Sequence, residues 1–316
     1  MVVVLIVLAL TAAGCSSPNR GAAESLVAAV ASYDVVAHRP ARFIVGLYSP
    51  DQSQTLAFGA VTFSLNYLGD GEQTDPFDPP AISPVEAVFL PIPGQELDPN
   101  AAGPTLVAGS VATGVYAAPD VEFDRPGFWE VVVAAEVDGR TETTTGAFEV
   151  LDSSDIPAVG DSAPRTRQPL AGDPTVDPKS IDSRAGGDTP IPDPELHDIT
   201  VADAIAAGRP VMVVVSTPTF CVSRFCGPIT DSVHQLTLEY GDRMEFIHLE
   251  VWQDFAGNEL NPAAVEWIAP TPETDGGEPW VFVIDADGTI VERFDNVASD
   301  VELLTAVESV LNSGDG

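Results

Sequence analysis

The sequence has little positive charge and few cysteines. Its 316 residues include 13 Lys and Arg against 48 Asp and Glu, a formal net charge of −35, and Lys179 is the single lysine. A chain with this charge repels phosphate backbones and anionic headgroups, so we expect no nucleic acid among its partners. The sequence also lacks a nucleotide-binding glycine loop, zinc-ligand spacing and a serine-histidine-acid constellation, and we expect no cofactor.

Proline and glycine are abundant instead. The 28 prolines and 26 glycines predict a β-rich, turn-rich chain with at least one extended linker. Hydrophobic residues make up 45% of the chain, enough to fill real cores. A chain of this length suits two domains better than one.

The N-terminus carries a short apolar run. Residues 2–13 are apolar or small and precede Cys15, but the run is shorter than the roughly 20 residues that span a bilayer. It resembles a bacterial lipoprotein signal, although no basic residue precedes it and Ala12 stands where leucine is commoner in that family. The resemblance implies a signal over 1–15, acylation of Cys15, a tether over 16–34 and a location in the cell envelope, lipid-anchored at the outer face of the membrane. The alternative is a buried segment with an incidental cysteine.

Residues 35–151 have an all-β pattern. Residues typical of strands concentrate in segments 42–48, 56–68, 85–90, 105–117, 128–137 and 140–150. From Trp129 to Val137 apolar side chains alternate along one face, and Asp138-Gly139 predicts a tight hairpin turn. These short strands predict an immunoglobulin-like sandwich that serves as an adaptor or binding module. The segment has no histidine or methionine cluster, so we expect no metal site in it.

Residues 152–196 are rich in Pro, Asp, Ser and Gly. Their apolar surface is too small to offset the cost of ordering the segment alone, so we expect an extended linker draped on a neighbouring domain. The boundary between the two domains therefore lies here.

Residues 197–312 alternate between helix and strand patterns. A short helix over 201–207 precedes a doubly buried strand over 210–215, a loop with two cysteines, an amphipathic helix and a second buried strand over 244–251. An irregular segment, a hairpin over 279–294 and a helix capped by Ser299 follow.

This order, β-α-β and then β-β-α, is that of the thioredoxin fold. The segment that ends in Phe220-Cys221 is similar to the strand and aromatic-cysteine approach of a thioredoxin active site, and Glu278-Pro279 occupies the place of the family's cis-proline. The resemblance implies an α/β thioredoxin-like domain over 197–312 and thiol-disulfide chemistry with protein thiols or disulfides as partners. The spacing departs from the family, because four residues separate Cys221 from Cys226 where thioredoxins have two.

Two assignments of the cysteines stay open. Cys221 attacks and Cys226 resolves in one register, which we prefer because Phe220-Cys221 follows the strand at nearly the family distance. The roles are exchanged in the other, because Phe225-Cys226 also resembles the motif. A thiolate near a helix N-terminus is stabilised by the helix dipole, and Arg224 between the cysteines adds positive charge. We therefore predict a redox site of Cys221, Cys226, Pro279 and Arg224, with the direction of electron flow left open.

Two other functions compete with an oxidoreductase. One is a noncatalytic envelope interaction protein in which the cysteines form a structural disulfide, and the other is copper delivery, since two spaced cysteines and a distant histidine also resemble Sco-type chaperones. His248 and His234 are the histidines available for the second function. Glu250 is a possible proton acceptor near the cysteines, and Trp280 either lines a partner groove or packs in the core.

Overall fold

The computed structural model describes residues 26–71, 82–94, 101, 103–108, 113–271 and 277–313. The lipoprotein signal and Cys15 lie outside the described residues, so the anchor stays a prediction. Within the described residues, no helix has the length and apolar character needed to span a bilayer.

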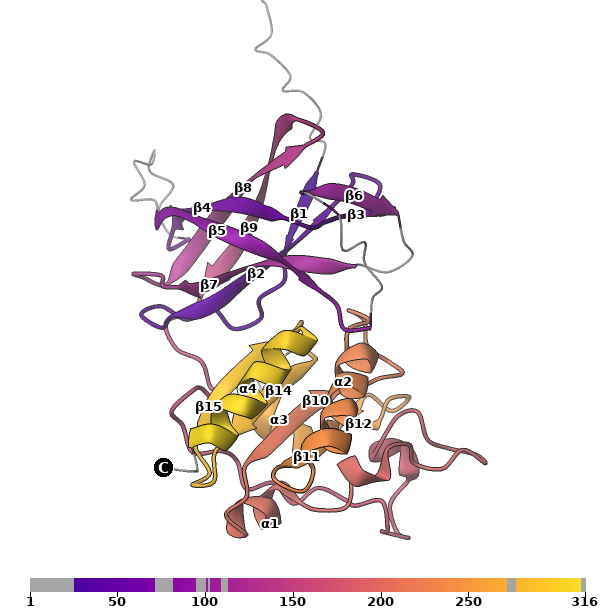
Figure 1. Cartoon of the computed structure of the whole chain (residues 1–316). Coiled ribbons are helices and arrows are strands. Elements are labelled where there is room, and N and C mark those ends of the chain that lie inside the picture. Colours follow the sequence, from indigo (N-terminus) through magenta and orange to yellow (C-terminus); the bar gives the residue numbers. More distant parts are fainter. Residues whose placement is uncertain are drawn as a thin grey trace, which may run out of the picture.

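The N-terminal region is a single curled sheet (Figure 1). Its strands are β1 (Val27–Val30), β2 (Ala41–Tyr48), β3 (Gln54–Ala57), β4 (Ala60–Gly69), β5 (Ile82–Pro91), β6 (Thr105–Ala108), β7 (Gly114–Val121), β8 (Gly127–Val137) and β9 (Arg140–Val150). They pair in the order β6-β3-β2-β7-β5-β4-β8-β9, with β1 on β2. The all-β prediction holds, but the immunoglobulin-like sandwich is not confirmed, because the nine strands form one continuous hydrogen-bonded sheet rather than two.

The sheet encloses one apolar core. Trp129, Val131 and Val133 alternate inward along β8 and are fully buried, as the pattern predicts, and Asp138 and Gly139 have the positive φ angles that the hairpin turn requires. The expected tether over 16–34 needs a correction at its C-terminal end. Leu26 is buried in this core, and β1 pairs with β2, since this apolar segment completes the sheet.

The linker packs on the C-terminal domain, as its composition predicts. It contains two short 3-10 helices, Pro178–Ser180 and Pro194–Leu196, and elsewhere follows the domain surface. Ile156 and Ala163 are buried in the same core as the first helix of that domain, and Ser162 forms an isolated bridge with Thr289. The segment is therefore ordered by what it touches rather than by its own core.

The C-terminal region has a thioredoxin-like fold. Its elements are α1 (Val201–Ala206), β10 (Val211–Ser216), α2 (Cys226–Tyr240), β11 (Glu245–Glu250), β12 (Trp252–Asp254), β13 (Glu259–Leu260), α3 (Pro262–Ile268), β14 (Trp280–Ile284), β15 (Ile290–Asp295) and α4 (Asp300–Ser313). The sheet order is β11-β10-β14-β15, with β10 parallel to β11 and β14 antiparallel to both its neighbours. This is the β-α-β and β-β-α order expected from the sequence. The expected irregular segment holds β12, β13 and α3.

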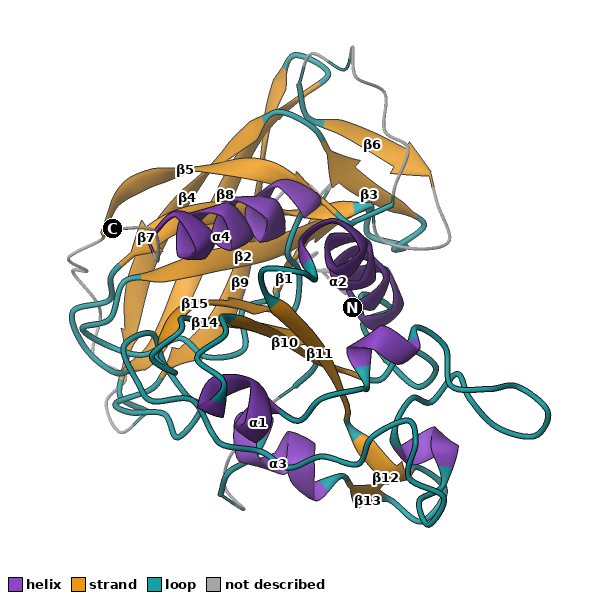
Figure 2. Cartoon of the chain, turned by 60° about the horizontal axis from the view of Figure 1, so that its bottom comes forward, coloured by secondary structure: helices purple, strands orange, loops and turns teal. Residues whose placement is uncertain are grey.

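Helices cover both faces of this sheet (Figure 2). Along β10, Val213 packs with the α1 and α3 side chains, and Met212 and Val214 pack with those of α2 and α4. Both faces of the strand are therefore buried, which explains its unbroken apolar sequence.

The two regions share a core. Ile44, Ile92 and Val115 of the β region belong to the same apolar cluster as α2 and α4, and these two helices lie directly against the curled sheet (Figure 1). Arg42 strengthens the contact by pairing with Glu302 at 2.8 Å. The N-terminal region is therefore positioned to touch the functional site of the C-terminal one.

Candidate functional site

The site begins in the loop between β10 and α2. Cys221 lies in this loop, Cys226 is the first residue of α2, and a disulfide joins them with their Cα atoms 6.0 Å apart. The Cys221 backbone N–H donates to the Thr217 carbonyl at 3.1 Å, and Arg224 adopts a φ of 65°. These features turn the loop back on itself, so that four intervening residues bring the sulfurs into contact.

The two sulfurs differ in accessibility. Cys226 is completely buried, whereas Cys221 is partly exposed. An incoming thiol or disulfide therefore reaches the Cys221 sulfur first. The Cys226 sulfur lies where the unpaired N–H groups of a helix start favour negative charge.

A second segment lies beside the sulfurs. The Glu278–Pro279 peptide bond is cis, and Pro279 is buried immediately before β14. A carboxylate oxygen of Glu278 and the two sulfurs all lie within 4.8 Å of one another. Ser223 is the bridge between the segments, because its Oγ is 3.2 Å from the Cys221 Sγ and donates to the Glu278 carbonyl at 3.5 Å. The structure thus brings together Cys221, Cys226 and the Glu278-Pro279 segment, as the sequence predicts.

The N-terminal region contributes Tyr33 to this site. Its hydroxyl donates to the Glu278 carbonyl at 2.9 Å, and its ring contacts Trp280 with 6.2 Å between centroids. Burial raises the pKa of the Tyr33 phenol, and the charges of Glu278 and Asp295 raise it further. The phenol therefore stays protonated and remains a donor.

Sequence reasoning missed Tyr33 and the Glu278 carboxylate. The sequence contains a feature that points to Glu278, because this residue directly precedes the proline that resembles the family's cis-proline. No sequence feature points to Tyr33, since it lies in the expected tether and reaches the site only through the packing of the two regions.

A cavity of about 920 Å³ has Phe220, the residue before Cys221, in its lining. The Phe220 ring stacks on Phe255 at 4.0 Å between centroids, and Trp252 meets Phe255 edge to face at 5.3 Å. All three line the cavity, and Phe255 is 47% exposed. An apolar surface thus includes the residue that directly precedes Cys221.

The other candidate residues differ in burial and in partners. Arg224 is exposed in the loop, and its expected electrostatic role stays a prediction. Trp280 is buried and stacks on Phe282, which makes it a core residue. Glu250 is buried and accepts from the Ser183 backbone N–H at 2.8 Å. His234 pairs with Glu195 at 2.7 Å on the surface of α2.

No histidine of the described residues joins the cysteines as a third metal ligand. The ligand group that contains both sulfurs is completed by Glu278, and the sulfurs are already bonded to each other. His248 belongs to a separate buried group. The copper-delivery alternative therefore lacks its histidine at this site.

Comparisons with known proteins add little. No family model and no curated protein matches the chain. Among solved structures, the chain is similar to a thiol:disulfide interchange protein of the thioredoxin family from Chlorobium tepidum TLS, with 14% sequence identity and a TM-score of 0.28. The match covers 51% of this chain and 99% of that one. The thioredoxin-like fold rests on the strand order described above and not on this superposition.

Proposed function

We propose that this protein is a thiol-disulfide oxidoreductase that acts on protein thiols or disulfides through the Cys221/Cys226 couple, at the outer face of a membrane to which Cys15 anchors it. The observation that carries the proposal is the disulfide itself. One of its sulfurs is accessible and the other is buried at the first residue of α2, with the cis Glu278-Pro279 segment beside them.

The geometry supports Cys221 as the sulfur that exchanges with substrate. In the oxidising direction, a substrate thiolate attacks the Cys221 Sγ, the Cys221–Cys226 bond breaks, and Cys226 leaves as a thiolate at the start of α2. A second substrate thiolate then attacks the substrate sulfur of the mixed disulfide. The substrate disulfide forms, and Cys221 is released as a thiolate. The reducing direction runs these two exchanges in reverse.

Glu278 supports the proton transfers of this cycle. Its carboxylate lies close to both sulfurs, so it can take the proton of the Cys226 thiol before that sulfur attacks the mixed disulfide. Bulk water does not reach Cys226, which is fully buried. The protein therefore has to supply the acceptor.

The cavity that Phe220 lines suits an extended polypeptide. Phe220, Trp252 and Phe255 offer an apolar wall to side chains that flank a substrate cysteine. This supports a protein substrate over a small thiol.

Equilibration of the Cys221/Cys226 couple against glutathione and dithiothreitol buffers tests the proposal. We expect a potential above about −300 mV together with measurable exchange with a disulfide-containing protein. A potential below that value with no exchange would establish the alternative, a structural disulfide in an interaction protein.

The anchor has its own test. Cys15→Ser should release the protein from membranes and abolish labelling by radioactive palmitate. Unchanged membrane association of the variant would remove the anchor from the proposal and leave the redox chemistry in place.

A further inference from the structure

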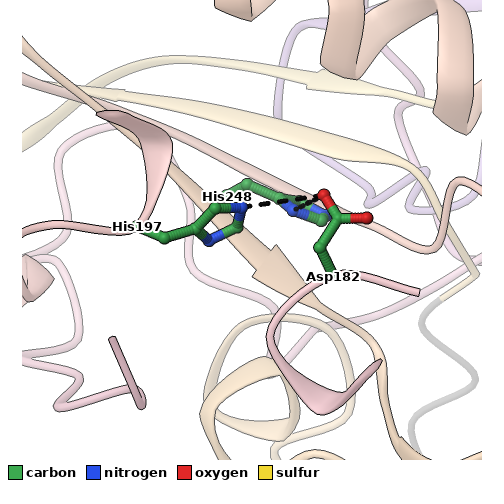
Figure 3. A group of neighbouring side chains, drawn as sticks. All are labelled: Asp182, His197 and His248. Atoms are coloured by element: carbon green, nitrogen blue, oxygen red, sulfur yellow. Dashed lines mark ion pairs between the residues drawn. The ribbon is translucent and has the colours of Figure 1, made fainter. Parts of the chain in front are cut away.

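A second cluster of reactive side chains lies away from the disulfide. Asp182 comes from the linker, His197 follows the 3-10 helix Pro194–Leu196, and His248 lies in β11. Their exposed fractions are 0%, 1% and 1%. Both imidazole rings turn toward the Asp182 carboxylate (Figure 3).

The distances within this cluster do not fit hydrogen bonds. The His248 Nδ1 lies 3.5 Å and the His197 Nε2 lies 3.6 Å from the same carboxylate oxygen, Asp182 Oδ2. A charge-assisted N–H···O bond is about 2.7–2.9 Å long. Neither ring nitrogen has a hydrogen-bond partner within the part of the chain that the structure describes.

The other nitrogen of His248 fixes which atom carries the proton. Its Nε2 lies 3.1 Å from the Ser216 carbonyl oxygen, which can only accept, so Nε2 holds the hydrogen. In the neutral ring, Nδ1 then directs a lone pair at a carboxylate oxygen. Two buried acceptors that face each other need a proton or a metal ion between them, and the separation of 3.5 Å is longer than a bond through a proton.

The spacing is that of metal ligands. Zinc binds imidazole nitrogen and carboxylate oxygen at about 2.0–2.2 Å, and two tetrahedral ligands at such bond lengths lie roughly 3.4 Å apart. The observed separations of 3.5 and 3.6 Å match this value. All three donor atoms lie within 4.8 Å of one another.

Neighbouring groups hold the ligands in place. The Arg184 guanidinium donates to both carboxylate oxygens of Asp182, at 3.0 and 2.7 Å, and also pairs with Asp193 and Asp231. The Ser216 carbonyl orients His248 in the same way. Outer partners of this kind are typical of metal sites.

We propose that Asp182, His197 and His248 bind one divalent transition-metal ion, with Zn²⁺ the ion that best fits two imidazoles and one carboxylate, and with a water molecule as the fourth ligand. The ion fastens the linker, which supplies Asp182, to β11 of the C-terminal domain.

The bound ion also supports the cysteine loop. Ser183, the residue after Asp182, donates its backbone N–H to Glu250 at 2.8 Å, and its Oγ accepts from the Thr219 N–H at 3.1 Å. Thr219 lies two residues before Cys221 in the sequence. The metal site is independent of the redox proposal, because its ligands include neither sulfur.

The site is tested by metal titration of the full chain carrying Cys15→Ser with its disulfide intact. No thiol is then available to bind the metal. We expect one Zn²⁺ per chain by calorimetry, with a Kd below about 1 μM, and Co²⁺ absorption typical of four nitrogen and oxygen ligands. His197→Gln and His248→Gln should each weaken binding by about 100-fold or more. The control is His38→Gln, which replaces an exposed histidine of the N-terminal region. It should bind Zn²⁺ as tightly as the parent protein, which is the Cys15→Ser chain.

Proteolysis supplies a second measurement. The protease Lys-C has a single site in this chain, Lys179, which lies three residues before Asp182. Zn²⁺ should slow this cleavage in the parent protein and in His38→Gln, and leave it unchanged in His197→Gln.

The proposal is overturned if the parent binds no Zn²⁺, or if both histidine variants bind it as tightly as the parent. If a histidine variant does not fold, the Co²⁺ spectrum of the parent protein tests the site. One equivalent of Co²⁺ with a four-coordinate spectrum supports the site, and a spectrum of hydrated six-coordinate Co²⁺ contradicts it.

Discussion

The C-terminal domain holds two clusters of reactive side chains that are built in different ways. Cys221 lies in a loop five residues before Cys226, the first residue of α2, and is partly exposed. Asp182, His197 and His248 come from the linker, the start of the domain and the edge strand β11, and all three are buried. The first cluster is suited to exchange with other molecules, and the second to holding the chain together.

The largest expected effect separates the two sulfurs of the first cluster. Cys226→Ser leaves the accessible Cys221 without its resolving partner, so it should accumulate a stable mixed disulfide with a substrate protein. Cys221→Ser should form none, because the remaining sulfur is buried. Nonreducing electrophoresis and mass spectrometry would detect the adduct. If only Cys221→Ser formed the adduct, Cys226 would be the sulfur that reacts with substrate and Cys221 the one that resolves.

Substitutions in the second cluster should change the free energy of unfolding. Asp182 is fully buried and forms a two-point ion pair with Arg184, and removal of one partner of a buried pair costs about 3–5 kcal/mol. We therefore expect Asp182→Ala to lower the free energy of unfolding in urea by this amount in metal-free protein. Asp124→Ala, which breaks an exposed pair with Arg125, should cost about 0–1 kcal/mol. Equal losses in the two variants would contradict the structural role of Asp182.

The same contrast explains what the sequence could predict. The disulfide loop follows β10 and Pro279 directly precedes β14, and the resemblance of both segments to the thioredoxin family predicts that they meet at one site. The Asp-His-His cluster depends on how a linker without a periodic pattern drapes over the sheet. The sequence indicates His248 as a candidate ligand, but nothing near it in sequence identifies Asp182 or His197 as its partners.

The fold shows a similar limit. The sequence predicts long strands such as β8 and β10, because the order of apolar and polar residues along each strand reflects which of its faces are buried. The expected strand over 56–68 is in fact divided between β3 and β4, since Phe58 and Gly59 both adopt positive φ angles. Phenylalanine gives no local warning of such a turn. The pairing of β1 with β2 likewise depends on tertiary packing.

A smaller effect tests whether the β region acts on the disulfide site. Tyr33→Phe removes the hydroxyl that donates to the Glu278 carbonyl, and loss of one such bond costs about 0.5–1.5 kcal/mol. We expect this loss in urea unfolding together with a measurable shift in the Cys221/Cys226 potential. Tyr116→Phe removes a similar bond, to the Phe58 carbonyl at 2.7 Å, and should lower stability without a shift in potential. Identical potentials in both variants would show that the β region does not influence the site.

The smallest expected effect concerns Asp295, which anchors Tyr33 by accepting its backbone N–H at 2.7 Å. Burial raises the pKa of this carboxyl, and the charge of Arg42, 3.6 Å away, offsets only part of the rise. Because the folded state holds the proton more tightly than the unfolded state, the stabilisation is complete at low pH and is lost as the pH rises through the folded-state pKa. The unfolding free energy of the parent minus that of Asp295→Asn should therefore fall as the pH rises above about 4 and then level off. A difference that grows with pH would mean that the ion pair with Arg42 outweighs burial, and Tyr33 would then be held by a charged carboxylate at all these pH values.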